Sequence, residues 1–114
     1  MLLVEGTAAG TTLTGSLYEP DEDPPSFRGV PDDGAPYVWI CDEFYEVETG
    51  GCRQALEDRD VQVAFEAPLP RGFERRKAAL AGAEEHLRTQ FSRIGVDPES
   101  VAVGVYELPG SSTN

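Results

Sequence analysis

Apolar residues recur at helical spacing in one long segment of the chain, residues 72–94. Arg, Glu, Gln and Thr fill the positions between them, so the segment predicts a long amphipathic helix. Gly95 suits a left-handed helix end with Val96 folded back on Phe91, and Pro98 stops the helix from continuing. The apolar positions of this helix are Phe73, Leu80, Ala83, Leu87, Phe91 and Ile94.

Shorter segments have the composition or the alternation of β-strands. Residues 2–18 are rich in Thr and aliphatic side chains with interspersed glycines, which predicts two strands joined near Ala9-Gly10. Residues 100–108 predict a final strand. Residues 61–67 alternate between apolar and polar, which predicts a strand whose core face is made of Val61, Val63, Phe65 and Ala67.

The aromatic residues are concentrated between positions 37 and 47. Residues 37–41 are all apolar, which is typical of a strand buried on both faces, and residues 43–48 mix polar and apolar like a half-exposed strand. One bent strand and two successive strands both fit this pattern. After a turn at 49–51, residues 52–56 fit either a returning hairpin strand or one helical turn, and the pattern leaves both open.

These elements together predict an α+β fold, with a mostly antiparallel sheet of about five strands and the helix on one face. The chain ends in a strand-helix-strand unit, whose crossover is right-handed if its strands are parallel in one sheet. We expect one domain over residues 1–109, in which the five prolines of residues 19–36 mark a long acidic loop. Residues 110–114 are expected to be a disordered tail. The second face of the sheet is left to solvent, to the 19–36 loop or to a second subunit.

The net charge of the chain limits the classes of partner that it is expected to bind. Its 114 residues include 21 acidic and 9 basic ones, a formal net charge of -12. Such a charge repels phosphates, so we expect neither nucleic-acid binding through a broad basic face nor binding to anionic membranes. No apolar run approaches the roughly 18 residues of a spanning helix. Residues 1–5 hold no basic region and end on an acid, which predicts no signal or transit peptide and a cytoplasmic location.

The basic residues are eight arginines and a single lysine, Lys77. Surface lysine is usually plentiful, so its scarcity beside abundant Asp and Glu resembles the composition of small acidic proteins from halophilic archaea. In the concentrated salt of such cells the self-repulsion of an acidic chain is screened. The resemblance is one of composition, and it implies no particular activity.

Two cysteines, Cys41 and Cys52, and the single histidine, His86, are the candidates for thiol or metal chemistry. They make no disulfide framework, and a structural zinc site needs four ligands, so we expect no disulfide and no metal. As a nucleophile paired with His86, Cys52 is the better candidate, because Asp42 and Glu43 oppose ionisation of the Cys41 thiol. The chain carries no recognised catalytic or cofactor motif, which favours a protein with no cofactor and no enzymatic activity.

Carboxylates also cluster near the aromatic segment. Two carboxylates across a cleft could perform acid and base chemistry or bind a divalent ion. In a chain this acidic, however, such clustering is expected by chance. The residues concerned are Asp42, Glu43, Glu46 and Glu48.

Four basic side chains cluster where the predicted helix begins: Arg71, Arg75, Arg76 and Lys77. Basic residues there oppose the helix dipole, whose positive end attracts acids. One explanation is a site for phosphate, sulfate or a carboxylate, bound by unpaired N–H groups and arginines. The other is ion pairing with Glu66, Glu74 or residues 1–57, a half of the chain with 12 acidic and 2 basic residues.

These observations favour a non-catalytic module that acts by protein association, including its own homodimer, in a salt-adapted cytoplasm. The exposed members of the aromatic segment are the candidate interface: Tyr37, Trp39 and Tyr45. The alternative is a protein that binds, or an enzyme that acts on, a small anionic ligand at the start of the helix. Dependence on protein concentration would indicate association, whereas saturable stabilisation by one anion would indicate a ligand site.

Overall fold

A computed structural model describes residues 1–20, 35–57, 59–66 and 70–107 of the chain. In these residues, two antiparallel sheets are joined by one α-helix, α1 (Arg76–Arg93), and a short 3-10 helix, η1 (Pro98–Ser100). The larger sheet has the strand order β7-β3-β2-β1-β8, and the smaller one has the order β4-β6-β5. The strands are β1 (Leu2–Ala8), β2 (Thr11–Tyr18), β3 (Tyr37–Ile40), β4 (Glu43–Glu46), β5 (Cys52–Ala55), β6 (Asp60–Glu66), β7 (Arg71–Phe73) and β8 (Ala102–Glu107).

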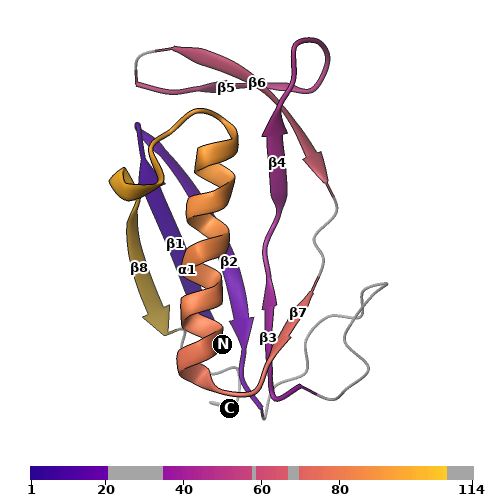
Figure 1. The fold of residues 1–114 in the computed structure, drawn as a ribbon, viewed down its shortest axis with the longest axis vertical. Coiled ribbons are helices and arrows are strands. Elements are labelled where there is room, and N and C mark those ends of the chain that lie inside the picture. Colours follow the sequence, from indigo (N-terminus) through magenta and orange to yellow (C-terminus); the bar gives the residue numbers. More distant parts are fainter. Residues whose placement is uncertain (21–34, 58, 67–69, 108–114) are drawn as a thin grey trace, which may run out of the picture.

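Helix α1 lies along one face of the larger sheet, and β5 and β6 pass beyond its C-terminal end (Figure 1). All neighbouring strands pair antiparallel in both sheets. The fold is therefore α+β, as the sequence predicts. Strands β7 and β8 flank the helix in sequence but form opposite edges of the larger sheet, so the helix crosses over the whole sheet between them.

The predicted hairpin at the start of the chain is confirmed. Ala9 and Gly10 form its two-residue loop with φ angles of 51° and 75°. Two positive φ values are the signature of the tight turn that matches the twist of paired strands, and glycine adopts them at no steric cost. The loop fixes the register from Ala8 opposite Thr11 to Leu2 opposite Leu17.

The helix begins at Arg76, later than the predicted start near Gly72, so the sequence prediction was wrong at this end. Residues 71–73 instead form β7, in which Phe73 lies opposite Tyr37 of β3. The sheet edge of β3 supplies partners for the backbone of this segment, and the Phe73 ring packs against Gly82 of the helix. A Cβ atom on Gly82 would lie 2.7 Å from Cε1 of that ring, so the glycine makes room for it.

The end of the helix is as predicted. Gly95 has a φ of 79°, its N–H donates to the carbonyl of Ser92 at 3.1 Å, and the N–H of Val96 donates to the carbonyl of Phe91 at 3.0 Å. These two bonds form a Schellman motif, which satisfies carbonyls at the helix end. Arg59 adds a third interaction, since its Nη2 donates to the carbonyl of Ile94 at 2.6 Å.

The chain passes from the larger to the smaller sheet at Cys41 and Asp42. Residues 37–40 and 43–46 are therefore two successive strands in different sheets, and not one bent strand. Residues 52–55 form a strand that pairs with β6, which resolves the second open alternative in favour of a hairpin.

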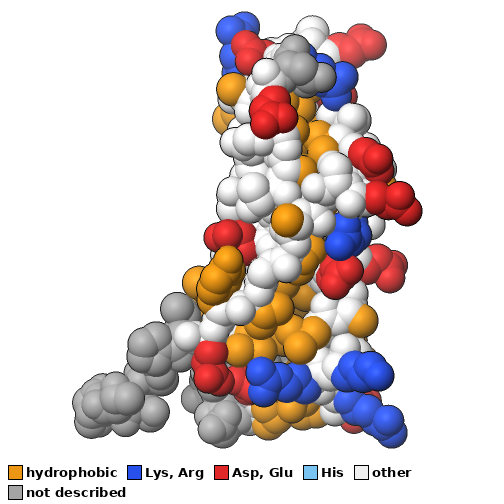
Figure 2. Space-filling view, turned by 90° about the vertical axis from the view of Figure 1, so that its left-hand side faces the viewer, with side chains coloured by type: hydrophobic (Ala, Val, Ile, Leu, Met, Phe, Trp, Pro, Cys, Tyr) orange, Lys and Arg blue, Asp and Glu red, His pale blue; other side chains and the backbone are white. Residues whose placement is uncertain are grey.

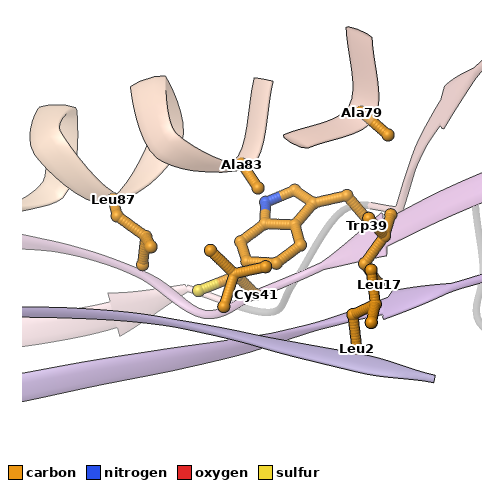
Figure 3. Packing of buried hydrophobic residues seen from close by; sticks show 8 residues of the cluster. Leu2, Leu17, Trp39, Cys41, Ala79, Ala83 and Leu87 are labelled. Carbon is orange, nitrogen blue, oxygen red and sulfur yellow. The ribbon is translucent and has the colours of Figure 1, made fainter. Parts of the chain in front are cut away.

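Two apolar clusters hold the layers together. The first packs the N-terminal and middle parts of α1 against the larger sheet, around Trp39, whose indole lies between the helix and the strands (Figure 3). A Cβ atom on Gly15 would lie 2.6 Å from Cζ2 of the Trp39 ring and closer still to its Cη2, so glycine makes room for the ring at this strand position. The second cluster packs the end of α1 against the smaller sheet and includes Phe44, Leu56, Val61, Val63, Phe91, Ile94 and Val101.

The core face predicted for residues 61–67 is correct at Val61 and Val63, which are buried, and wrong at Phe65. Phe65 is 55% exposed, because it lies near the end of β6, where its ring meets the Phe44 ring at 5.7 Å between centroids. Ala67 lies outside the described residues, as do most of the 19–36 segment and all of residues 110–114.

Candidate functional site

Three polar side chains of α1 bind three successive residues at the passage between the sheets. His86 Nε2 lies 3.3 Å from the carbonyl oxygen of Asp42. Gln90 Oε1 accepts the backbone N–H of Phe44 at 3.0 Å. Arg93 Nη1 lies 3.7 Å from Glu43 Oε1 in an ion pair. We call His86, Gln90 and Arg93 the polar clasp.

The polar clasp satisfies backbone groups that the sheets leave unpaired. Asp42 lies between β3 and β4 and has no strand partner, and Phe44 lies on β4, an edge strand that pairs only with β6 among the described strands. Buried backbone groups require hydrogen-bond partners, and the helix supplies them from the side. His86 and Gln90 are consequently buried, at 5% and 1% exposure, although they are polar.

The hydrogen bond to the Asp42 carbonyl determines which ring nitrogen of His86 carries the proton. A carbonyl oxygen only accepts, so Nε2 carries the proton, and Nδ1 holds a lone pair. Nδ1 and the Trp39 Nε1 atom are buried without a hydrogen-bond partner among the described residues, and the two rings meet edge to face at 5.9 Å. Burial lowers the pKa of His86, the bond to Asp42 opposes this, and the nearby Arg71 adds to the lowering. The imidazole is therefore neutral at pH 7.

A cleft of about 220 Å³ opens beside the polar clasp, between the middle of α1, β7 and the start of β4. Its charged walls are Arg71 and Arg93 on the basic side and Glu43 and Glu85 on the acidic side. Glu43 is already paired with Arg93. Arg71 makes no ion pair or side-chain hydrogen bond within the described part of the chain, which leaves its guanidinium available at the wall of the cleft.

The structure separates the four basic residues predicted as one anion site. Arg71 lies on β7 and lines the cleft, whereas Arg75 is the N-cap residue of α1, and Arg76 and Lys77 follow in its first turn. Arg76 Nη1 lies 3.7 Å from Glu19, which belongs to the acidic half of the chain. The anion site at the helix start stays a prediction, now without Arg71.

The two cysteines differ in environment. Cys41 is buried, and its Sγ lies 3.9 Å from the carbonyl oxygen of Thr14. Burial, followed by the charges of Asp42 and Glu43, raises the pKa of Cys41 to about 12. Cys52 is exposed on β5. Among the described residues, no three His, Cys, Asp or Glu side chains gather as a metal site would require.

The clustered carboxylates are also divided by the structure. Glu43 points inward to the polar clasp. Glu46 and Glu48 line a shallow hollow on the smaller sheet, whose one arginine, Arg53, is ion-paired with Asp60 at 3.8 Å. Asp42 is exposed at the passage between the sheets.

The three predicted interface aromatics have different positions. Trp39 is only 1% exposed, so the expectation of an exposed Trp39 is wrong: the residue fills the core between α1 and the sheet. Tyr37 is half-buried against the same cluster, and Tyr45 is 40% exposed on β4. A contact role for Tyr37 and Tyr45 stays a prediction.

Residues 1–107 match a family of unknown function, DUF7113. The chain belongs to this family. Neither a curated protein nor a solved structure matches it. In the described part of this DUF7113 chain, no helix is long and apolar enough to cross a membrane.

Sequence reasoning considered His86 only for thiol or metal chemistry and missed Gln90 and Arg93 as functional positions. The signal was present in their spacing, since residues four and then three apart on a helix share one stripe. A polar stripe directly beside the apolar one indicates buried hydrogen bonding. Its partners in residues 42–44 are distant in sequence, so the spacing alone does not name them.

Proposed function

We propose that this chain is a non-catalytic interaction module that associates with a second copy of itself through strand β8. The observation that carries the proposal is the exposure of β8, an edge strand of the larger sheet. Val105 is 47% exposed on the helix side and Tyr106 is 54% exposed on the opposite face. An edge strand presents unpaired backbone groups, and apolar side chains on both of its faces favour pairing with another strand.

The other sheet edges are less suited to pairing. Strand β7 has 3 residues, and β4 and β5 have 4 residues each. Glutamates begin and end β4, β5 contains Arg53, and β7 begins with Arg71. Charges and short length protect an edge against association. Strand β8 has 6 residues and a single charge at its end, Glu107.

Strand β8 is also complementary to itself. In an antiparallel pair centred on Gly104, Val103 lies opposite the partner's Val105, and Ala102 lies opposite the partner's Tyr106. Glu107 then faces the partner's Val101, so no like charges are opposed. The resulting two-fold interface would join two larger sheets into one continuous sheet.

The surrounding surface supports this contact. Figure 2 faces the left-hand side of Figure 1, where β8 lies, and shows hydrophobic side chains along the middle of this face, with Asp and Glu on both sides of them and Lys and Arg mainly at the bottom and the top. A Cβ atom on Gly104 would lie 2.8 Å from Tyr106 Oη, so the tyrosine ring lies back across the glycine. This arrangement provides an apolar surface directly at the proposed two-fold axis.

The charge of the chain sets the conditions for association. Two copies with a formal charge of -12 each repel one another at low salt. At 1 M salt the Debye length falls to about 3 Å, and the apolar contact then dominates. A salt-adapted cytoplasm, which the scarcity of lysine favours, would supply that condition.

Two of the groups considered for catalysis, His86 and Cys41, have structural roles, which supports a non-catalytic protein. His86 is neutral and bound to the Asp42 carbonyl. The Cys41 thiol is buried and protonated. Thiolate chemistry needs the opposite environment, with a lowered pKa and access for a substrate.

The test is the mass of the protein in solution, measured by light scattering in 2 M KCl over a range of concentrations. A chain of 12.3 kDa should appear at about twice this mass and dissociate on dilution. Val105→Lys should give the monomer mass, because a lysine on the edge strand blocks pairing. The matched control is Tyr45→Lys, which adds the same charge to an exposed strand residue of the smaller sheet and should remain dimeric.

Either of two results would overturn the proposal. One is a wild-type protein that is monomeric at every concentration. The other is dissociation by Tyr45→Lys while Val105→Lys stays dimeric, which would move the interface to β4. Circular dichroism melts of both variants show whether they are folded.

A further inference from the structure

We propose that the cleft beside the polar clasp binds a compact oxyanion, a small carboxylate or a phosphate, through Arg71. The cleft holds about 220 Å³, which is room for about seven water-sized groups, since a water takes about 30 Å³ in the liquid. This proposal is independent of the association through β8, which lies at the opposite edge of the larger sheet from β7.

Arg71 is the side chain whose environment favours binding of an anion. Other arginines near hollows of this protein are already engaged: Arg53 pairs with Asp60, and Arg88 binds Glu84 and the carbonyls of Pro98 and Val101. Arg71 has no such partner among the residues that the structure describes, and it stands at the wall of a cavity. A guanidinium binds carboxylate and phosphate through paired N–H groups, which makes it the preferred side chain for these ligands.

The other residues that line the cleft determine which oxyanions it favours. Arg93 adds a second guanidinium, partly neutralised by Glu43 at 3.7 Å. Thr89 and Gln90 contribute polar groups to the lining, and Glu85 stands at the wall as a carboxylate. Glu85 and Glu43 together offset the two arginines, so the cleft is close to neutral and favours a ligand of low charge over a polyphosphate.

The residues that line the cleft come from different strands and the helix, and they are brought together only in the folded protein. Arg71 lies opposite Trp39 in the β3–β7 pairing, and the Trp39 ring packs on His86. The polar clasp holds the start of β4 in place on the other side. The backbone of Arg71 therefore belongs to a strand and that of Arg93 to a helix, and neither lies in a loop, which lowers the entropic cost of binding.

The single histidine provides a direct readout, because His86 lines the cleft and its ring protons are the only histidine signals of the chain. Sodium phosphate and sodium acetate are titrated into the protein at constant ionic strength, and the His86 signals are followed by NMR. We expect a saturable shift with at least one of these probes. Arg71→Gln should abolish the shift.

The matched control is Arg75→Gln, which removes a guanidinium of the helix start that lies outside the cleft lining. This variant should bind as the wild type does. The proposal is overturned if neither probe moves the His86 signals saturably, or if Arg75→Gln abolishes the shift and Arg71→Gln preserves it. The latter result would place the anion at the helix start. Because the loss of the Arg71 charge by itself moves the His86 signals, a melting temperature of Arg71→Gln close to that of the wild type is the check that this variant is folded.

Discussion

The side-chain oxygen of Gln90 accepts the backbone N–H of Phe44 at 3.0 Å, and this bond ties α1 to the strand where the smaller sheet begins. The two residues before Phe44 are also bound by the helix, since His86 Nε2 donates to the Asp42 carbonyl and Arg93 forms an ion pair with the Glu43 side chain. The polar clasp thus holds the two sheets in one arrangement around the helix. Burial of apolar side chains stabilises the packing of α1 on both sheets. The polar clasp fixes the position of the strands relative to the helix.

Replacing Gln90 tests this role. Gln90→Leu keeps a side chain of similar size but leaves the buried N–H of Phe44 without an acceptor, which should destabilise the fold by about 1–3 kcal/mol. Ser92→Leu, at an exposed position on the same helix, is the control and should change stability by less than about 0.5 kcal/mol. Denaturant unfolding in KCl measures both. Equal stabilities for the two variants would contradict the role of the clasp.

His86 should make stability depend on pH. Its pKa is lowered in the folded chain, so the unfolded chain takes up the proton first, near pH 6.5. Stability is therefore fully present above about pH 6.5 and falls as the pH drops towards the folded pKa. Melting temperatures between pH 7.5 and 5.5 check this.

His86→Gln is the matched variant, because glutamine retains a neutral N–H donor for Asp42 and does not titrate. Its melting temperature should be flatter than that of the wild type across this pH range. Parallel pH profiles for wild type and variant would show that His86 is not the titrating group.

The two thiols should differ in reactivity. Cys52 is exposed and should react rapidly with a disulfide reagent such as DTNB, whereas Cys41 is buried with its pKa raised to about 12 and should react only after unfolding. We expect one reactive thiol per native chain and two in denaturant. Cys52→Ser should leave none in the native state. Two thiols with similar native rates would place Cys41 at the surface.

The turn and the helix end that are specified by neighbouring residues were predictable from the sequence. Ala9-Gly10 is a two-residue loop that glycine makes possible, and Gly95 with Val96 ends the helix through bonds to residues three and five positions before. In both cases the residues that specify the structure lie close together in the chain. These two structures can therefore be predicted directly from the local sequence.

Features that depend on distant partners were not predictable. Phe73 has helical spacing with Leu80, yet it belongs to β7 because β3 offers a sheet edge to pair with. Trp39 is part of an aromatic run that looks available for contacts, yet Gly15 leaves the space that its ring fills in the core. The cleft of Arg71 likewise exists only once β7 has formed beside α1.

The most direct test of association through β8 is a cross-link at its two-fold axis. Residues directly opposite each other in an antiparallel pair have Cα atoms about 4.5–5.5 Å apart, a distance that a disulfide spans. Gly104→Cys in a Cys52→Ser background would therefore bring two thiols face to face across the axis, once the Tyr106 hydroxyl end swings aside. Thr7→Cys in the same background, on β1 inside the sheet, is the control.

Mild oxidation in 2 M KCl, followed by non-reducing electrophoresis, is the measurement. We predict a covalent dimer for Gly104→Cys at protein concentrations where Thr7→Cys remains a single chain. If Gly104→Cys cross-links no better than Thr7→Cys, the β8 strands do not pair, and the proposed association is contradicted.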